Sequence, residues 1–120
     1  MSNKIEKLKN QSAISLLFKE GNHFFYRSIR ISYLFEEGEP GIFYFISVPK
    51  KKYKKAVDRN KIRRQIREIL VHKVDFSSLQ NRRVNLCIAF TDKNQLNFND
   101  LSVVLKETFR IFNKNQQVNE

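Results

Sequence analysis

Three parts of the chain have the pattern of hydrophobic and polar residues that is typical of a β-strand. Residues 24–35 turn to alternation of hydrophobic and polar residues, and residues 42–48 form an aromatic and β-branched run; both contain the residue types that strands favour. Glutamate, glycine and proline fill residues 36–41 between them, which predicts a turn and hence a hairpin. Residues 84–90 alternate in the same way and predict another strand.

Three other segments repeat their apolar residues at helical spacing. Ser12 is placed to cap the first predicted helix, and Gly21 is placed to end it. The second predicted helix covers residues 59 to about 74, and the third starts at Asn99 or Asp100. The predicted order is therefore α-β-β(-β)-α-β-α, which belongs to the α+β class.

The domain organisation is simple. The chain has 120 residues, which is the size of one domain, and no repeat or internal linker divides it. Residues 1–120 are therefore predicted to form a single domain. Residues 1–10 are basic and are expected to be a flexible N-terminal tail, and the polar residues 113–120 are expected to be a C-terminal tail.

Cysteine content and hydropathy indicate the compartment. Cys87 is the only cysteine, so no internal disulfide can form, which fits a reducing compartment. The N-terminal segment lacks the apolar core of a secretory signal, and no run of about 18 apolar residues could form a transmembrane helix. We therefore expect a cytoplasmic protein without membrane contact.

Positive charge is the most unusual feature of the composition. The chain has 23 lysines and arginines against 12 acidic residues, which gives a net charge of +11. Residues 49–68 alone hold six lysines and four arginines against two acidic residues, a net charge of +8. Such a concentrated excess is typical of a protein that binds a polyanion, and RNA is the partner we expect.

The second predicted helix places its apolar and cationic residues on neighbouring faces. At about 100° per residue, three isoleucines and Leu70 fall in one stripe that should be buried. Beside this stripe, four arginines and an asparagine share a sector of about 140°. Guanidinium groups match phosphate oxygens, and an asparagine amide can both donate and accept. The candidate RNA-binding residues are Arg59, Asn60, Arg63, Arg64 and Arg67 of this sector, with Lys50 and Lys51 of the preceding loop.

The sequence contains no pattern of a metal site or of a catalytic nucleophile. His23 and His72 lie far apart, and Cys87 falls within a predicted strand, where it should be a small core residue. The acidic residues cluster only at Glu36, Glu37 and Glu39, in the predicted turn at residues 36–41. We therefore expect no catalytic residue and no metal ligand in this chain, which disfavours a freestanding nuclease.

Two motifs in the basic segment are more specific than its charge. Residues 45–51 read Phe-Ile-Ser-Val-Pro-Lys-Lys, and residues 56–68 read Ala-Val-Asp-Arg-Asn-Lys-Ile-Arg-Arg-Gln-Ile-Arg-Glu. Together they resemble the protein subunit of bacterial ribonuclease P, in which a strand ending in Ser-Val-Ser-Lys-Lys leads to Ala-Val and then to an Arg-Asn-Arg helix. Weaker similarity extends the resemblance from Lys7 to Lys114.

The resemblance implies a fold and a division of labour. The implied fold is a sandwich of three helices and a mixed sheet, in the order α-β-β-β-α-β-α. It is similar to the second domain of ribosomal protein S5 and has a left-handed βαβ crossover. The RNA subunit would cleave precursor tRNA with Mg²⁺ that it binds itself, and would thereby remove the 5′ leader. The protein would be the accessory subunit of this ribonucleoprotein endonuclease, bound to the RNA subunit 1:1.

The resemblance also implies contact residues. The arginine helix would bind the RNA subunit, and Lys61 would join these contacts although it points away from the arginine sector. A cleft between the sheet and the first helix would hold the single-stranded leader of the precursor tRNA. The implied leader contacts are Phe18, Ile14 and Tyr33 or its neighbour Ser32.

The sequence departs from the family pattern in the motif and in the cleft. Lys61 replaces an arginine, Pro49 replaces a common serine, and Ile14 stands where an aromatic residue is common.

Two other functions also fit the composition. A ribosomal or general RNA-binding protein would bind RNA without changing precursor cleavage. A DNA-binding module would place the arginine helix in a major groove, which the strand-rich surroundings and the lack of a dimerisation heptad disfavour.

Overall fold

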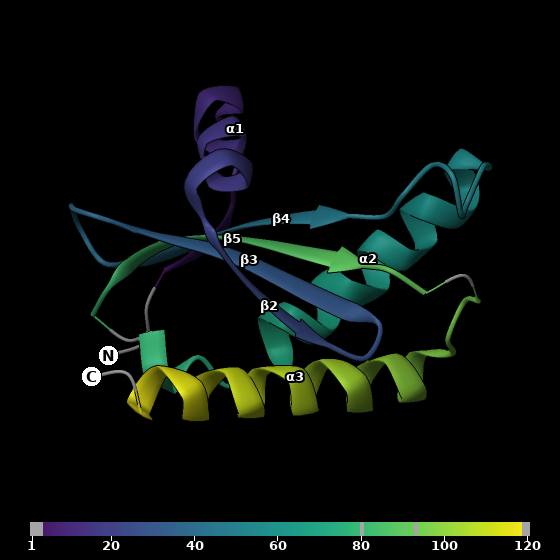
Figure 1. Ribbon diagram of the computed structural model, residues 1–120. Helices are drawn as coiled ribbons and strands as arrows, with labels where there is room; N and C mark the ends of the chain where they lie inside the picture. Colours follow the sequence, from purple (N-terminus) through teal and green to yellow (C-terminus); the bar gives the residue numbers. More distant parts are fainter. Residues whose placement is uncertain (1–3, 80, 93, 119–120) are drawn as a thin grey trace.

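The computed structural model describes residues 4–79, 81–92 and 94–118 of the chain. They form one sheet with helices on both faces (Figure 1). The predicted α+β class and the order α-β-β-β-α-β-α are confirmed, and one additional strand precedes them. In chain order the elements are β1 (Ile5–Lys7), α1 (Gln11–Glu20), β2 (Asn22–Tyr26), β3 (Ile29–Glu36), β4 (Gly41–Ser47), α2 (Ala56–His72), a 3₁₀ helix (Ser77–Leu79), β5 (Arg83–Phe90) and α3 (Phe98–Val118).

The sheet is mixed, with the strand order β1-β4-β5-β3-β2. β4 runs parallel to β1 and β5, whereas β3 is antiparallel to both β5 and β2. α1 covers one face, where Leu8, Ile14, Leu17 and Cys87 form a small core. α2 and α3 cover the other face and enclose the larger core (Figure 1). Functional side chains can therefore project from two separate faces.

The central strand is β5, and its position corrects the predicted hairpin. The sequence predicts that residues 24–35 pair with residues 42–48, but β3 and β4 lie on opposite sides of β5. Residues 84–90 are all buried, and a strand that is buried on both faces is most stable between two neighbours. The turn after β3 therefore carries the chain across β5 instead of back along β3.

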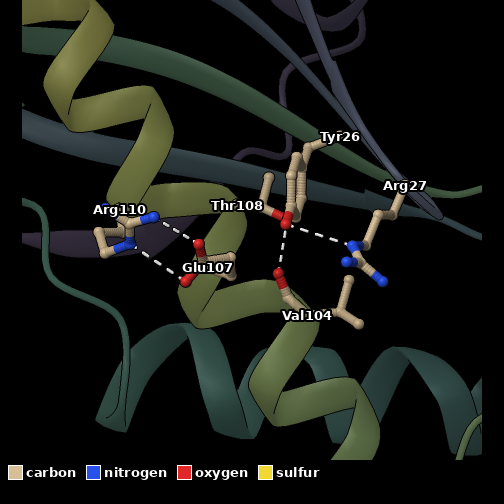
Figure 2. A network of polar contacts seen from close by, with 6 residues as sticks. All are labelled: Tyr26, Arg27, Val104, Glu107, Thr108 and Arg110. Carbon is tan, nitrogen blue, oxygen red and sulfur yellow. Dashed lines mark hydrogen bonds and ion pairs between the residues drawn. The ribbon is translucent and has the colours of Figure 1, made fainter.

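Residues 24–35 contribute to two strands, because a two-residue turn separates β2 from β3. Arg27 in this turn has a positive φ of 51°, as tight hairpin turns require. The turn lies beside α3, where Arg27 Nε donates to the Tyr26 hydroxyl close to the Glu107–Arg110 ion pair (Figure 2). Neither glycine nor asparagine marks this turn in the sequence, so the alternation of residues alone does not reveal it.

Regular structure extends into both segments that were expected to be tails. β1 pairs with β4, and Leu8 directly after it is buried. At the other end α3 continues to Val118, and Asn113 is buried. Where the structure describes these segments, both hold regular structure and bury side chains against the sheet or the 3₁₀ helix. Residues 1–3 and 119–120 lie outside the described residues.

Asparagines cap two helices at positions other than those predicted. Asn10, not Ser12, caps α1, because its side chain accepts a hydrogen bond of 3.1 Å from the backbone amide three residues later. Asn97, not Asn99 or Asp100, does the same for α3, with a distance of 2.8 Å. Both asparagines satisfy an amide that the first turn of a helix would otherwise leave unpaired.

β4, α2 and β5 form the βαβ unit that the resemblance implies. β4 and β5 are adjacent and parallel, and α2 joins them on the face that it shares with α3 (Figure 1). The predicted stripe of α2 is confirmed, because Ile62, Ile66, Ile69 and Leu70 are all buried. The left-handed sense of the crossover stays a prediction. In the described part of the chain, no helix has the length and hydropathy needed to span a bilayer.

Candidate nucleic-acid interface

α2 turns its basic sector toward one edge of the sheet. The helix begins at Ala56 rather than at Arg59, and Asp58 lies in its first turn. A carboxylate in the first turn complements the helix dipole. The buried isoleucine stripe fixes the rotation of the helix about its axis. The arginines beside this stripe are thereby held over the edge formed by β1 and β4.

A groove of about 720 Å³ separates this side of α2 from β1 and β4. Its volume lies within the range of about 300–1,000 Å³ that is usual for ligand sites. The helix contributes cations and an amide, whereas the strands contribute mainly apolar side chains. The groove brings together four of the eight predicted RNA-subunit contacts. Its lining residues are Val57, Asn60, Arg63, Arg64 and Arg67 of α2 with Lys7, Tyr44, Phe45 and Ile46 of the strands.

The cations of the groove stand without neutralising carboxylates. No acidic residue lines the groove, and none of the ion pairs among the described residues involves its arginines. Arg63 is linked instead to Asn60, whose Oδ1 accepts a hydrogen bond from the guanidinium at 2.5 Å. Neighbouring guanidinium groups repel one another, so a bound phosphate gains attraction and also relieves that repulsion.

Arg59 belongs to the predicted sector but has a different role. Its Nη1 donates to the carbonyl oxygens of Tyr53 and Lys54, both at 2.8 Å. The guanidinium therefore ties the first turns of α2 to the loop that precedes the helix. Because two of its donor contacts are used within the protein, Arg59 has fewer free donors for a phosphate than Arg63.

The lysine loop, residues 50–55, is anchored to the segment that follows β5. Tyr53 is buried, and its hydroxyl donates to the carbonyl of Asp92 at 3.0 Å. Burial, and to a smaller extent the Asp92 carboxylate, raises the pKa of Tyr53. Lys52 donates to the carbonyl of Thr91, so this lysine also holds the loop. The predicted contacts Lys50, Lys51 and Lys61 are exposed and lie outside the lining of the groove.

The residues of the predicted leader cleft do not all share one face. Ile14 is buried between α1 and the sheet, and Phe18 on the same helix keeps 41% of its surface exposed. Tyr33 lies on the opposite face, where its ring packs against Phe112 of α3. Successive residues of a strand point to opposite faces. The neighbouring Ser32 therefore lies on the α1 face, because it pairs across the ladder with Cys87, which belongs to the core under α1.

Two residues of the α1 face are absent from the predicted cleft. Phe45 on β4 packs edge-on against Phe18, with ring centroids 6.5 Å apart. Arg30 on β3 lies close enough to Cys87 to lower its pKa, and its Nε is buried without a hydrogen-bond partner in the described part of the chain. Strand alternation places each residue on one face of its strand. The sequence does not indicate that α1 covers this face, and so neither residue could be selected.

The histidines and the cysteine show no arrangement for catalysis. Burial raises the pKa of Cys87 to about 11, against the smaller opposing effect of Arg30. The thiol is therefore neutral and is a core residue, as predicted. His23 shares a hydrogen bond of 2.7 Å with Ser32, and His72 is exposed. Among residues 4–79, 81–92 and 94–118, no group of three or more His, Cys, Asp or Glu side chains could hold a metal ion.

Comparisons with known proteins agree with the central motif. The family model described as Ribonuclease P matches residues 2–116 of the chain. The ribonuclease P protein component of Rickettsia canadensis (strain McKiel) is 34% identical over 114 residues. That similarity covers 85% of this chain and 97% of the Rickettsia protein.

Solved structures share the fold. The RNase P protein from Thermotoga maritima superposes with a TM-score of 0.70 at 18% identity, over 88% of this chain and 96% of that one. The RNase P protein from Staphylococcus aureus gives a TM-score of 0.69 at 24% identity, over 88% and 94% of the two chains. The structures establish the fold, and the sequence matches cover most of the chain. This chain therefore belongs to the ribonuclease P protein family.

Proposed function

We propose that this protein is the accessory subunit of a ribonuclease P ribonucleoprotein and binds both its catalytic RNA and the 5′ leader of precursor tRNA. The observation that carries the proposal is the groove beside α2, in which Asn60 and three arginines stand without carboxylate partners. A soluble surface needs no such segregation of charge. A polyanion with closely spaced phosphates matches it.

The RNA subunit is the proposed partner of the α2 side. Arg63, Arg64 and Arg67 repeat along one flank of the helix and can contact successive phosphates of one RNA strand. The exposed lysines of the anchored loop extend this positive surface beyond the start of the helix. Each phosphate neutralised should steepen the salt dependence of binding by about 0.7–0.9 log units per log unit of salt.

The 5′ leader is the proposed partner of the α1 face. Phe18 and Phe45 offer a partly exposed aromatic pair on which unpaired bases can stack. Arg30 is half-buried on the same face, and its positive charge suits a nearby leader phosphate. Ile14 contributes apolar packing beneath Phe18 and no aromatic surface. In this proposal Tyr33 is a core residue.

Catalysis is assigned to the RNA subunit. The proposal places the Mg²⁺ on the RNA, as the resemblance of the central motif to the ribonuclease P protein subunit implies. When bound there, Mg²⁺ supports hydrolysis of the phosphodiester at the leader junction. The protein, with its net charge of +11, reduces the phosphate repulsion that Mg²⁺ would otherwise screen. A 1:1 complex in the cytoplasm, producing mature tRNA 5′ ends, completes the proposed function.

Cleavage of precursor tRNA at low Mg²⁺ tests this proposal. A bacterial ribonuclease P RNA is assayed with and without the protein, and the protein is also assayed alone. We expect strong stimulation of the RNA and no cleavage by the protein alone. RNA binding without stimulation would support a general RNA-binding protein instead, and cleavage by the protein alone would overturn the assignment of catalysis to RNA.

A further inference from the structure

Strand β4 has an uncovered edge inside the groove beside α2. β1 pairs with β4 only from Ile42 to Tyr44, whereas β4 continues to Ser47. The last contact is the amide of Leu8, which donates to the Tyr44 carbonyl at 2.6 Å before the chain leaves for α1. None of the described residues pairs with the remaining part of this edge.

The peptide groups of Ile46 are directed toward the uncovered edge. In a parallel ladder, alternate residues turn their N–H and C=O groups to the same side. Ile42 and Tyr44 use these groups to bind the β1 segment, through the Lys4 carbonyl at 2.7 Å and the Leu8 amide at 2.6 Å. Ile46 is next in this alternation and lines the groove. It therefore presents one donor and one acceptor side by side to whatever occupies the groove.

Apolar and cationic side chains surround this peptide. Tyr44 lines the groove at the end of β1, and Val57 in the first turn of α2 keeps 75% of its surface exposed. Arg63 and Arg67 lie on the helix wall, and Lys7 lies on the strand wall. Phosphates alone require only the cations. Apolar surface beside a paired donor and acceptor matches a nucleobase, which has a flat face and a hydrogen-bonding edge.

We infer that the groove binds one unpaired nucleotide of the RNA subunit. Its base edge bonds to the peptide groups of Ile46, its base face lies against Val57, and its flanking phosphates contact Lys7 and the arginines. The inference rests on the proposed function, since it requires that the groove faces RNA. An extended peptide could also add to an open strand edge. The lining with four cations and no acidic residue favours RNA over such a peptide.

Three short RNA hairpins test the inference with the full-length protein. The first carries one unpaired nucleotide bulged from its stem, the second carries an abasic residue at the bulge, and the third is fully paired. Dissociation constants are measured at low ionic strength, where the basic helix should bind any RNA. We expect the bulged hairpin to bind about tenfold more tightly than the other two, because only it supplies a base. Equal affinities for all three would overturn the inference.

Val57 allows a test of the apolar contact without loss of charge. Val57→Ser should weaken binding of the bulged hairpin about fourfold, the loss expected for roughly one buried methylene group, and leave the paired hairpin unchanged. Val103→Ser is the matched control, because Val103 on α3 is 65% exposed and lies outside the groove. An equal effect of the two substitutions on the bulged hairpin would contradict the contact with Val57.

NMR chemical shifts of backbone amides can identify which ligand binds at the uncovered edge of β4. The Ile46 N–H resonance should shift when the bulged hairpin is added and stay in place when the abasic hairpin is added. A shift caused only by an extended peptide would assign the edge to strand addition and overturn the inference.

Arg63→Ala distinguishes a failure of the nucleotide site from a failure of the proposed RNA-binding function. It should weaken all three hairpins alike if the groove binds RNA, and no effect on any of them would reject the proposed function itself.

Discussion

Arg59 and Arg63 lie one turn apart on α2, but their guanidinium groups have different surroundings. Arg59 donates to two loop carbonyls at 2.8 Å, whereas Arg63 faces the groove. We expect Arg59→Ala to lower the free energy of unfolding by about 1–3 kcal/mol, because it leaves both carbonyls without their charged donor. Arg63→Ala should leave stability nearly unchanged and weaken RNA-subunit binding about tenfold. Urea unfolding and RNA titration of both variants would show whether the two roles are separate.

The salt dependence of RNA binding provides a second test of the same side chains. Arg63→Ala combined with Arg67→Ala should lower the slope of log affinity against log salt by about 1.4–1.8, since two phosphate contacts are lost. Lys106 is a suitable control position, because it is exposed on α3 and lies outside the groove. An unchanged slope in the double variant would contradict the assignment of these arginines to phosphates.

The buried thiol of Cys87 makes stability depend on alkaline pH. Burial raises the pKa of Cys87 from 9.0 to about 11. Above pH 9 the unfolded chain therefore loses this proton more readily than the folded protein. The contribution of the neutral, buried thiol to the free energy of unfolding is fully present below pH 9. It is lost as pH rises through 11, and its full size is roughly 2–3 kcal/mol. The free energy of unfolding, measured with urea across this pH range, should fall less steeply for Cys87→Ala than for the unmodified protein. Parallel curves for the two proteins would argue against a role of the thiol.

At the scale of single elements, sequence periodicity identified the helices better than the strand pairing. The isoleucine stripe of α2 was predictable because burial of a helix face leaves a regular trace in the sequence. β1 was not predictable, because three residues of an edge strand bury too little to produce a pattern. The groove beside α2 has β1 and β4 as its other wall, so Lys7 and Phe45 became site residues only once the strand order was known. Tyr33 was misplaced for a related reason, since alternation fixes which residues share a face but not which helix covers it.

The lysine loop is an element whose order depends on one tyrosine. The Tyr53 hydroxyl donates to the Asp92 carbonyl at 3.0 Å and so joins the loop to the segment after β5. Tyr53→Phe should lower the free energy of unfolding by about 1 kcal/mol and accelerate amide exchange across residues 50–55. Tyr44→Phe is the matched control, because the Tyr44 hydroxyl has no hydrogen bond among those found in the described part of the chain. The same acceleration in both variants would show that the hydroxyl bond does not order the loop.

The whole molecule places two proposed RNA-binding surfaces on opposite faces of one sheet. α2 carries the groove, and α1 carries the partly exposed Phe18. The two surfaces meet at Phe45, which packs against Phe18 and also lines the groove where β1 ends. An RNA-subunit strand beside α2 and a leader strand over α1 would therefore pass close to the same short stretch of β4. This contact explains physically how one small domain could hold both RNAs in a fixed relation.

This arrangement predicts different defects for three alanine substitutions. Arg67→Ala should weaken RNA-subunit binding and leave the preference for precursor over mature tRNA intact. Phe18→Ala should spare assembly and reduce that preference by about tenfold, because one stacking contact with a leader base is lost. Phe45→Ala should produce both defects, since its ring belongs to both surfaces. Assembly titrations and paired precursor and mature tRNA affinities measure the two effects separately. If Phe45→Ala reproduced only the Phe18→Ala defect, the two surfaces would not be joined at β4.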